Sequence, residues 1–154
     1  PAMRDKKGEK YLTHYFCKSH IPEAYVERRQ TRTGYINVSC PELTAVDLLT
    51  YQAKTGSVSR AATVLAELVE KLDFERLGAD FVKEVPVTSL QRLGYILDEV
   101  LEEGKAAESV YSLLKSSGFV LQYAPLKAGK SSEGCERNAK WRIIVNETIE
   151  IDEL

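Results

Sequence analysis

The hydrophobic pattern of this sequence changes its period near residue 40, and that change limits the folds open to the chain. Before it, residues 11–19 and 35–39 show the aromatic or β-branched alternation of strands, and residues 24–31 fit a strand despite their charges. A hairpin turn is expected over 32–34, at Thr33-Gly34. After residue 40, apolar residues recur at helical spacing. Because strands and helices are segregated along the chain, the pattern predicts an α+β fold.

Capping residues divide the helical region. Ser39 and Glu42 have the spacing of a capping box, as do Thr88 and Gln91, and Ser59 is a candidate cap between the two boxes. The expected helices cover residues 40–55, 60–72, 73–85, 88–103 and 106–116. We therefore expect a cluster of four to five helices.

Two glycines bear on the helix expected over 88–103. Gly104 is a plausible residue just past its end. Gly94 lies inside it, where glycine costs about 1 kcal/mol relative to alanine. A close helix crossing at Gly94 is the simplest explanation for that choice.

The C-terminal part returns to strand-like patterns. Residues 119–123 and 141–145 predict strands, joined by a Gly/Ser/Lys loop over 125–139. Residues 145–151 alternate with an acidic polar face and fit either an edge strand or a tail. The fold expected is therefore α+β, with a small antiparallel N-terminal sheet, then the helices, then a C-terminal strand pair.

Length and composition fit one globular domain. The chain has 154 residues, of which 44% are hydrophobic, so it can bury a core. Residues 1–10 are polar and predict a disordered lead, and residues 11–154 predict a single domain. No run approaches the roughly 18 apolar residues of a membrane span, and no signal segment opens the chain, so no membrane partner is expected. Three widely spaced cysteines imply no disulfide framework, which makes the cytoplasm the expected compartment.

The net charge of −2 is the sum of two opposite halves. Residues 1–34 hold 8 basic and 4 acidic groups, and residues 35–154 hold 13 basic and 19 acidic groups. A nucleic-acid-binding domain typically carries a clear basic excess, which the whole chain lacks. The basic N-terminal part nevertheless stands apart from an acidic remainder.

No catalytic constellation is recognisable. Cys17 and His20 lack a second pair at zinc-ligand spacing, so we expect no metal. Gly129-Lys130-Ser131 resembles the end of a phosphate loop, but Ala124 stands where that loop needs its first glycine, so we expect a solvated loop and no nucleotide cofactor. We expect no enzyme. A metal-dependent nuclease of unrecognised type stays open, because sequence does not show which carboxylates meet in space.

What remains is a binding surface rich in arginine, which suits both phosphate contacts and carboxylate pairing. The candidates for contact with a partner or a phosphate are Lys18, Arg28, Arg29, Arg32, Lys54, Arg60 and Arg92. The alternative is scattered surface charge, with Arg28 or Arg29 paired to Glu27 or Glu23.

Residues 34–49, GYINVSCPELTAVDLL, resemble the signature G-x-I-x-V-S-x-P-E-x-T-x-x-D-L in the C-terminal domain of AbiEi-family antitoxins. Two further blocks match the family in order, one over 62–68 with 72–73 and one over 90–97. The likeness runs from about residue 11 to residue 121. The signature positions are Ser39, Pro41, Glu42, Thr44 and Asp47, which by their residue types fit capping and packing rather than catalysis.

The resemblance implies a role in an AbiE type IV toxin–antitoxin system, a form of abortive infection and phage defence. In the family, an N-terminal winged helix binds the operator and represses transcription, and the C-terminal domain counters a nucleotidyltransferase-like toxin. This sequence shows no winged helix, so operator DNA is expected only through a missing N-terminal domain. The leading hypothesis is therefore an antitoxin domain that acts on such a toxin through a protein surface or through the toxin's substrates. The alternative is a DNA-binding or dimerisation accessory domain of a transcriptional regulator.

Overall fold

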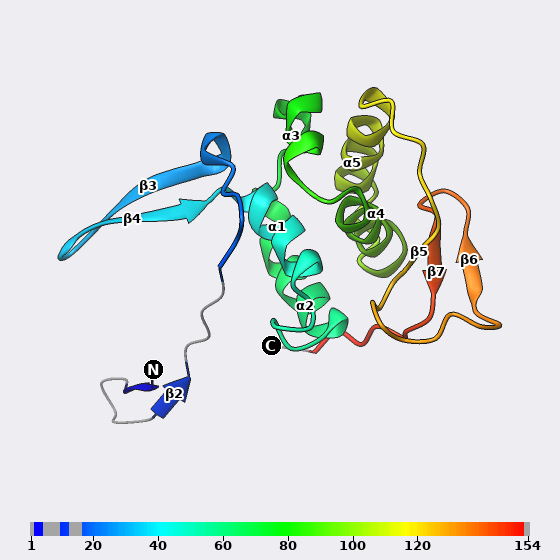
Figure 1. The fold of residues 1–154 in the computed structure, drawn as a ribbon, viewed down its shortest axis with the longest axis horizontal. Coiled ribbons are helices and arrows are strands. Elements are labelled where there is room, and N and C mark those ends of the chain that lie inside the picture. The colour runs from blue at the N-terminus through cyan, green and yellow to red at the C-terminus, as the bar shows by residue number, and fades with distance from the viewer. Residues whose placement is uncertain (1, 5–9, 13–16, 153–154) are drawn as a thin grey trace.

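The fold was obtained as a computed structural model, which describes residues 17–152 and the backbone of residues 2–4 and 10–12 (Figure 1). The described helices are α1 (Pro41–Thr50), α2 (Val58–Leu68), α3 (Ala79–Glu84), α4 (Val87–Tyr95) and α5 (Gly104–Ser116). The described strands are β1 (Ala2–Arg4), β2 (Lys10–Leu12), β3 (Val26–Thr31), β4 (Gly34–Ser39), β5 (Ala124–Pro125), β6 (Glu136–Asn138) and β7 (Ile143–Val145). The α+β fold with segregated strands and helices is confirmed.

The N-terminal strands form two separate antiparallel pairs, β1 with β2 and β3 with β4. The strand expected over 11–19 is observed only as β2, since residues 17–19 are not extended into a strand and residues 13–16 lie outside the described part. The disordered lead expected over 1–10 contains β1 and the start of β2, and its residues 1 and 5–9 also lie outside the described part.

The β3–β4 hairpin forms where the sequence predicts it. Val26 pairs with Ser39 at its base and Thr31 with Gly34 at its tip, around a turn at Arg32-Thr33. Gly34 has a φ of 150°, a conformation that strains residues with a side chain, which explains glycine after the turn.

The helices form the core, with α4 at its centre between α1 and α5 (Figure 1). The side chains of Leu90, Leu93, Ile96 and Leu97 are completely buried. Burying one leucine contributes about 1.5–3 kcal/mol, so this stripe is a main source of stability. After α4 the chain continues as one π-helical turn, Ile96–Val100, instead of the regular helix expected to residue 103.

The C-terminal strands form a three-stranded sheet in the order β5-β7-β6, where a strand pair was expected. Strand β5 is parallel to β7, and β6, which lies inside the expected loop, is antiparallel to it. Residues 119–123, where a strand was expected, are not a strand. The loop around Lys130 is held by Asn146, whose side-chain amide donates to the carbonyls of Lys127 and Lys130.

Trp141 fixes this sheet to the helices. Its ring is completely buried against Gly94, where an added Cβ would lie 1.9 Å from Cζ3. Its indole N–H donates to Asp98 Oδ2 at 2.9 Å. The close helix crossing expected at Gly94 is therefore wrong, because the group that needs the space is the Trp141 ring and not a second helix.

The tail beyond β7 is extended along α2 and forms no strand. The backbone N–H of Glu150 donates to Ser59 Oγ at 3.1 Å, and that of Asp152 donates to Thr63 Oγ1 at 3.2 Å. Of the two possibilities left open for residues 145–151, the structure therefore has β7 ending at Val145 and a tail after it.

The expected caps are wrong by one or two residues. Cys40, without a side-chain cap bond, precedes α1, because Ser39 is still paired in β4. Ser57, not Ser59, caps α2 and accepts from the N–H of Arg60.

Helix α4 also differs from the helix expected over 88–103 in the residues at both of its ends. Pro86 stands at the N-cap of α4, and Gln91 is buried, donating to the carbonyls of Gln122 and Trp141, so these residues form no capping box. Gly104 opens α5 rather than following the end of α4.

Candidate interaction surface

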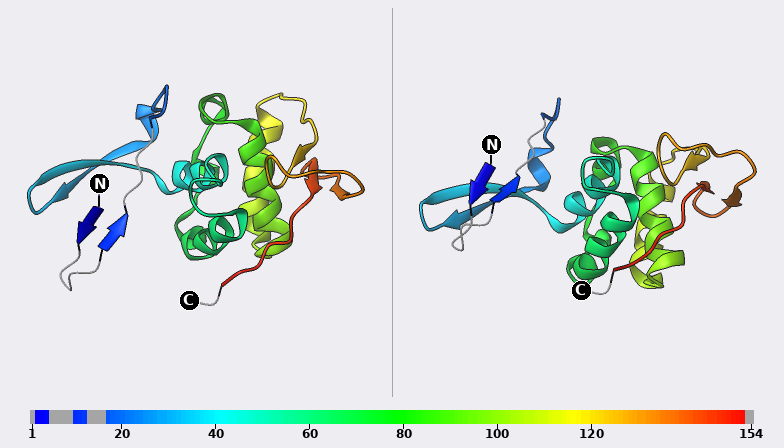
Figure 2. Two further views of the ribbon diagram at one scale, coloured as in Figure 1. Left: turned by 60° about the horizontal axis from the view of Figure 1, so that its bottom comes forward. Right: turned by 90° about the horizontal axis from the view of Figure 1, so that it is seen from below.

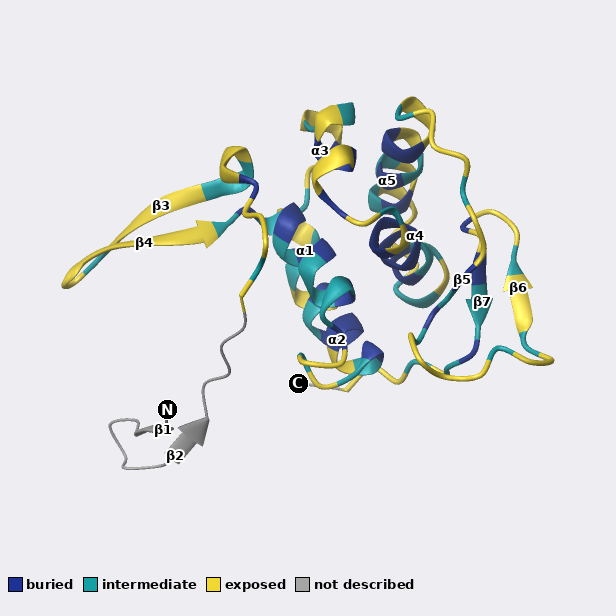
Figure 3. Ribbon diagram, viewed as in Figure 1, coloured by how far each residue is buried: buried dark blue, intermediate teal, exposed yellow. Residues whose placement is uncertain are grey.

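The β3–β4 hairpin projects from the helical body, as all three views in Figures 1 and 2 show. Every residue from 27 to 38 except Thr31 is exposed, on both faces (Figure 3). Within the part of the chain that the structure describes, no strand other than β3 pairs with β4. A two-stranded hairpin with both faces in water is marginally stable, so this element depends on its anchor to the helices and offers a surface to a partner.

One face of the hairpin combines an arginine with an aromatic ring. Cross-strand partners share a face, so Arg28, Gln30, Tyr35 and Asn37 lie on the same side. The Arg28 guanidinium carbon lies 4.2 Å from the centre of the Tyr35 ring. Such a contact at an exposed site contributes about 0.5–1 kcal/mol and holds the guanidinium in place over the ring.

The opposite face is apolar with an ion pair beside it. Ile36 and Val38 are 52% and 39% exposed, and Arg29 pairs with Glu27 at 2.5 Å. Eight large apolar residues are exposed in the described part of the chain, and four of them are Ile21, Tyr35, Ile36 and Val38. The hairpin and the segment beside it therefore gather a large share of the chain's exposed apolar groups.

The hairpin meets the helices at a joint made from the signature residues. Ser39 Oγ and Thr44 Oγ1 share a hydrogen bond of 2.7 Å, and Thr44 Oγ1 also donates to the Cys40 carbonyl at 3.0 Å. Lys18 donates to both oxygens of Asp47, at 2.8 and 3.0 Å. These contacts tie β4 and the segment before β3 to α1.

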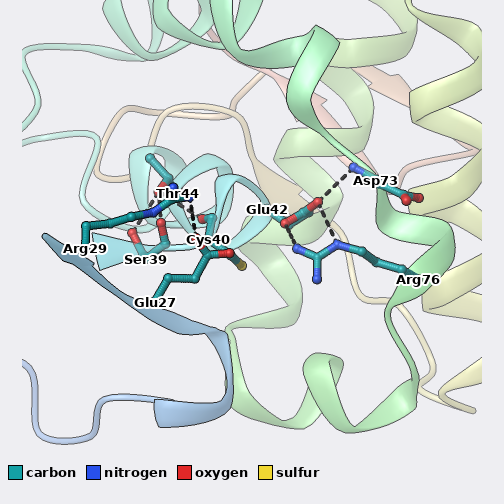
Figure 4. A network of polar contacts seen from close by, with 8 residues as sticks. All are labelled: Glu27, Arg29, Ser39, Cys40, Glu42, Thr44, Asp73 and Arg76. Carbon is teal, nitrogen blue, oxygen red and sulfur yellow. Dashed lines mark hydrogen bonds and ion pairs between the residues drawn. The ribbon is translucent and has the colours of Figure 1, made fainter. Parts of the chain in front are cut away.

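Glu42, near the start of α1, is buried next to this joint (Figure 4). Its carboxylate accepts the Asp73 N–H at 2.8 Å and pairs with Arg76 at 2.6 Å. Burial raises the pKa of Glu42, but these hydrogen bonds outweigh it and hold the pKa below its ordinary value. Glu42 is thus a fixed anion that joins α1 to the turn at 73–76.

An open pocket lies at the base of the hairpin, on the face that carries Asn37. Its volume is about 520 Å³. It is lined by Lys18, Ile21, Glu23, Val26, Asn37, Ser39, Leu43 and Asp47. Three of these residues are apolar and five are polar or charged, so the pocket offers a small apolar wall within a polar rim.

The structure brings together only part of the predicted basic set. Arg28, Arg29 and Arg32 all lie on the hairpin, and Lys18 lies at its base in the ion pair with Asp47. Arg29 is paired with Glu27, as the alternative of local ion pairs expected.

The other three candidates lie elsewhere. Lys54 and Arg60 lie around the turn between α1 and α2, beyond the end of α1 that faces away from the hairpin. Arg92 is 9% exposed and its Nε donates to the Pro125 carbonyl at 2.9 Å, so it supports the C-terminal sheet. Burial lowers the pKa of its guanidinium. The expectation of a surface arginine at 92 is corrected, because the sheet covers that face of α4.

Nothing in the described part assembles a reaction centre. No group of three or more His, Cys, Asp or Glu residues there could hold a metal ion. Burial raises the pKa of the Cys40 thiol, which disfavours the thiolate that a nucleophile requires. None of the described helices is long and apolar enough to cross a bilayer.

Sequence reasoning missed the uncharged residues of the surface. The alternation over residues 35–39 predicts an ordinary strand with one buried face, whereas Tyr35, Ile36 and Val38 are all exposed. The available signal is that residues 34–39 carry no charge and place a large apolar side chain on each face, Tyr35 on one and Ile36 and Val38 on the other. The strand before it has four charged or amide residues in a row.

Comparison with known proteins places this α+β domain, with its projecting hairpin, among the antitoxins of toxin–antitoxin systems. The family model described as the AbiEi antitoxin C-terminal domain matches residues 15–99, more than half of the chain. The chain therefore belongs to the AbiEi antitoxin family, which is linked to abortive infection. The match ends inside the π turn, so the C-terminal sheet lies outside it.

Two further comparisons complete this result. The crystal structure of the RV2827C protein from Mycobacterium tuberculosis is similar at 22% sequence identity, with a TM-score of 0.49. That match covers 68% of this chain and 34% of the other, so the chain spans about a third of that protein. No curated protein matches the chain.

Proposed function

We propose that this chain counters a nucleotidyltransferase-like toxin in the cytoplasm by binding, and that the arginines of the hairpin make the contact. Family membership supplies the antitoxin role. The observation that carries the finer proposal is the exposed hairpin, on which Arg28, Arg29 and Arg32 stand against one acidic residue, Glu27. A protein that acts by binding needs such a surface and no reaction centre.

The hairpin suits this task for two physical reasons. Guanidinium groups form bidentate hydrogen bonds with the carboxylates of a protein and with the phosphates of a nucleotide substrate. The exposed Ile36 and Val38 add apolar area beside the charges, which a protein partner covers and a phosphate does not. The apolar face therefore favours the toxin itself over its substrates as the bound species.

The test is rescue of growth when this chain is co-expressed with a candidate nucleotidyltransferase-like toxin encoded by a neighbouring gene. Wild-type protein should restore growth, and the double variant Arg28→Glu with Arg32→Glu should fail to restore it. The matched control is Arg137→Glu, an exposed arginine whose guanidinium likewise lies over a tyrosine, at 5.1 Å from the ring of Tyr123.

Binding of purified toxin should weaken at least about tenfold in the hairpin variant, which corresponds to about 1.4 kcal/mol. Circular dichroism verifies that both variants are folded. Rescue by the double variant at the wild-type level would refute the role of the hairpin, and no rescue by the wild type would refute the antitoxin role of this chain.

The second candidate is a DNA-binding accessory role, which the basic charge of the hairpin supports. An electrophoretic shift with the upstream intergenic DNA separates the two. Phosphate contacts are strongest at low salt and weaken steeply as the salt concentration rises. If the protein does not bind the DNA even at low salt, the DNA-binding role is ruled out.

A further inference from the structure

Strand β4 has an unprotected outer edge. Its six residues, Gly34–Ser39, include no charged residue and no proline. Exposed edge strands usually carry such groups, because unpaired N–H and C=O groups otherwise recruit another strand. The neighbouring β3, by contrast, carries Glu27, Arg28 and Arg29. The two edges of the hairpin therefore differ, and only that of β4 is open to pairing.

We propose that β4 pairs along this edge with β4 of a second copy of the chain, in antiparallel orientation. The pairing makes one four-stranded sheet from two hairpins. Three or more strands are needed for a sheet that is stable in water, so the second copy supplies what the isolated hairpin lacks. An isologous contact about a twofold axis is also the commonest form of self-association.

The sequence of β4 is complementary to itself in one register. With the axis at Asn37, each Asn37 lies opposite its counterpart and each Ile36 lies opposite the second copy's Val38. Paired residues share a face, so the four apolar side chains form one continuous patch. No charge meets a like charge in this register. Pairing through β3 would instead bring the arginines of the two copies together.

The same register seats an aromatic side chain in the pocket at the hairpin base. Tyr35 of one copy falls opposite Ser39 of the other, on the face that opens into the pocket of about 520 Å³. Tyr35 is 59% exposed in the single chain, and the pocket offers Ile21, Val26 and Leu43 as apolar walls. The turn with Arg32 then approaches Glu23 of the other copy, a charge of opposite sign, while Asp47 of that copy stays paired with its own Lys18.

The projection of the hairpin makes this arrangement sterically possible. A six-residue strand spans about 20 Å, and the antiparallel arrangement places the two helical bodies at opposite ends of the new sheet. The outer edges, formed by β3 with Arg28 and Arg29, stay free. Self-association leaves these two arginines available to the proposed toxin contact, involves Arg32, and is measured without the toxin.

Charge placed on the axis tests the pairing. Asn37→Asp and Asn37→Lys each put like charges opposite one another, so the dissociation constant of each variant alone, from sedimentation equilibrium, should rise at least about tenfold. An equimolar mixture should regain association, because unlike charges then meet. A loss of folding cannot produce that recovery. If the mixture associates no better than either variant alone, or if the wild type is monomeric at every concentration, the proposal fails.

A disulfide test locates the contact. In a Cys17→Ser, Cys135→Ser background, Asn37→Cys should form a covalent dimer on mild oxidation, since residues directly opposite lie within disulfide reach. Gln30→Cys is the matched control, as it is exposed on the same face but in β3. Equal rates of cross-linking at the two positions would overturn the assignment to the β4 edge.

Discussion

The contact between Gly94 and Trp141 allows a prediction whose sign separates two physical effects. A Cβ at position 94 would lie 1.9, 2.3 and 2.4 Å from three carbons of the indole ring. Ordinary contact begins at 3.4 Å, so in Gly94→Ala the ring must retreat by about 1.5 Å. Trp141 is completely buried and cannot move into solvent without leaving its site. Its hydrogen bond to Asp98 is lost or weakened in the process.

The magnitude follows from three terms. Overpacking a core costs about 1–3 kcal/mol. Loss of a hydrogen bond to a charged group costs about 1.5–3 kcal/mol. Replacement of a helix-interior glycine by alanine returns up to about 1 kcal/mol. The free energy of unfolding should therefore fall by about 2–5 kcal/mol, whereas helix propensity alone would raise it.

Urea unfolding measures this change, with Trp141 as the only tryptophan of the chain and hence an unambiguous fluorescent probe. With an m-value of about 2 kcal/mol per M, the midpoint should fall by about 1–2.5 M. Gly104→Ala is the control, because Gly104 is the first residue of α5 and an added Cβ meets nothing within 4 Å. It should be neutral or stabilising. A Gly94→Ala protein more stable than wild type would refute the packing argument.

Two further predictions concern the joint and the helix ends. Glu42→Gln should lower the free energy of unfolding by about 1–3 kcal/mol at neutral pH, since the amide replaces an anion that accepts from Asp73 and Arg76. Because the folded-state pKa of Glu42 is below 4.5, this advantage of the wild type is full above that pH and is lost as the pH falls through the lowered pKa; urea midpoints that do not converge in acid would contradict it. Ser57→Gly should cost only a few tenths of a kcal/mol, as glycine is tolerated at an N-cap. Ser59→Gly, inside α2, should cost about 1 kcal/mol or more, and thermal melts showing the reverse order would restore Ser59 as the cap.

The local sequence pattern predicted the helices but not the residues at which they begin and end. The expected caps show the reason. Ser39 and Glu42 have the right spacing for a capping box, but a cap uses only bonds within one helix. In the folded chain Ser39 is held by its strand pairing with Val26, and Glu42 finds a backbone N–H 31 residues away. Tertiary partners of this kind are invisible in a window of ten residues.

The C-terminal sheet shows the same limit more strongly. Strand β5 has two residues and β6 three, too short to produce a recognisable alternation. Side chains of α4 hold the sheet from outside the strands, since Arg92 bonds to the Pro125 carbonyl in β5 and Gln91 to the Trp141 carbonyl just before β7. The sequence showed Arg92 as a charge on an amphipathic helix, and only the fold reveals that a sheet covers it.

The position of the signature residues in the fold, rather than their chemistry, indicates what they do. Ser39 and Thr44, Lys18 and Asp47, and Glu42 with Arg76 all lie where the hairpin enters the helical body. A hairpin that binds a partner loses affinity if it must first be oriented, because that ordering consumes part of the binding free energy. The first two sets of polar contacts, at the base of the hairpin, fix its orientation before the partner arrives, and the third holds α1 to the turn at 73–76. It follows that substitutions at Asp47 or Thr44, which touch no exposed part of the hairpin, should weaken partner binding through the angle of the hairpin.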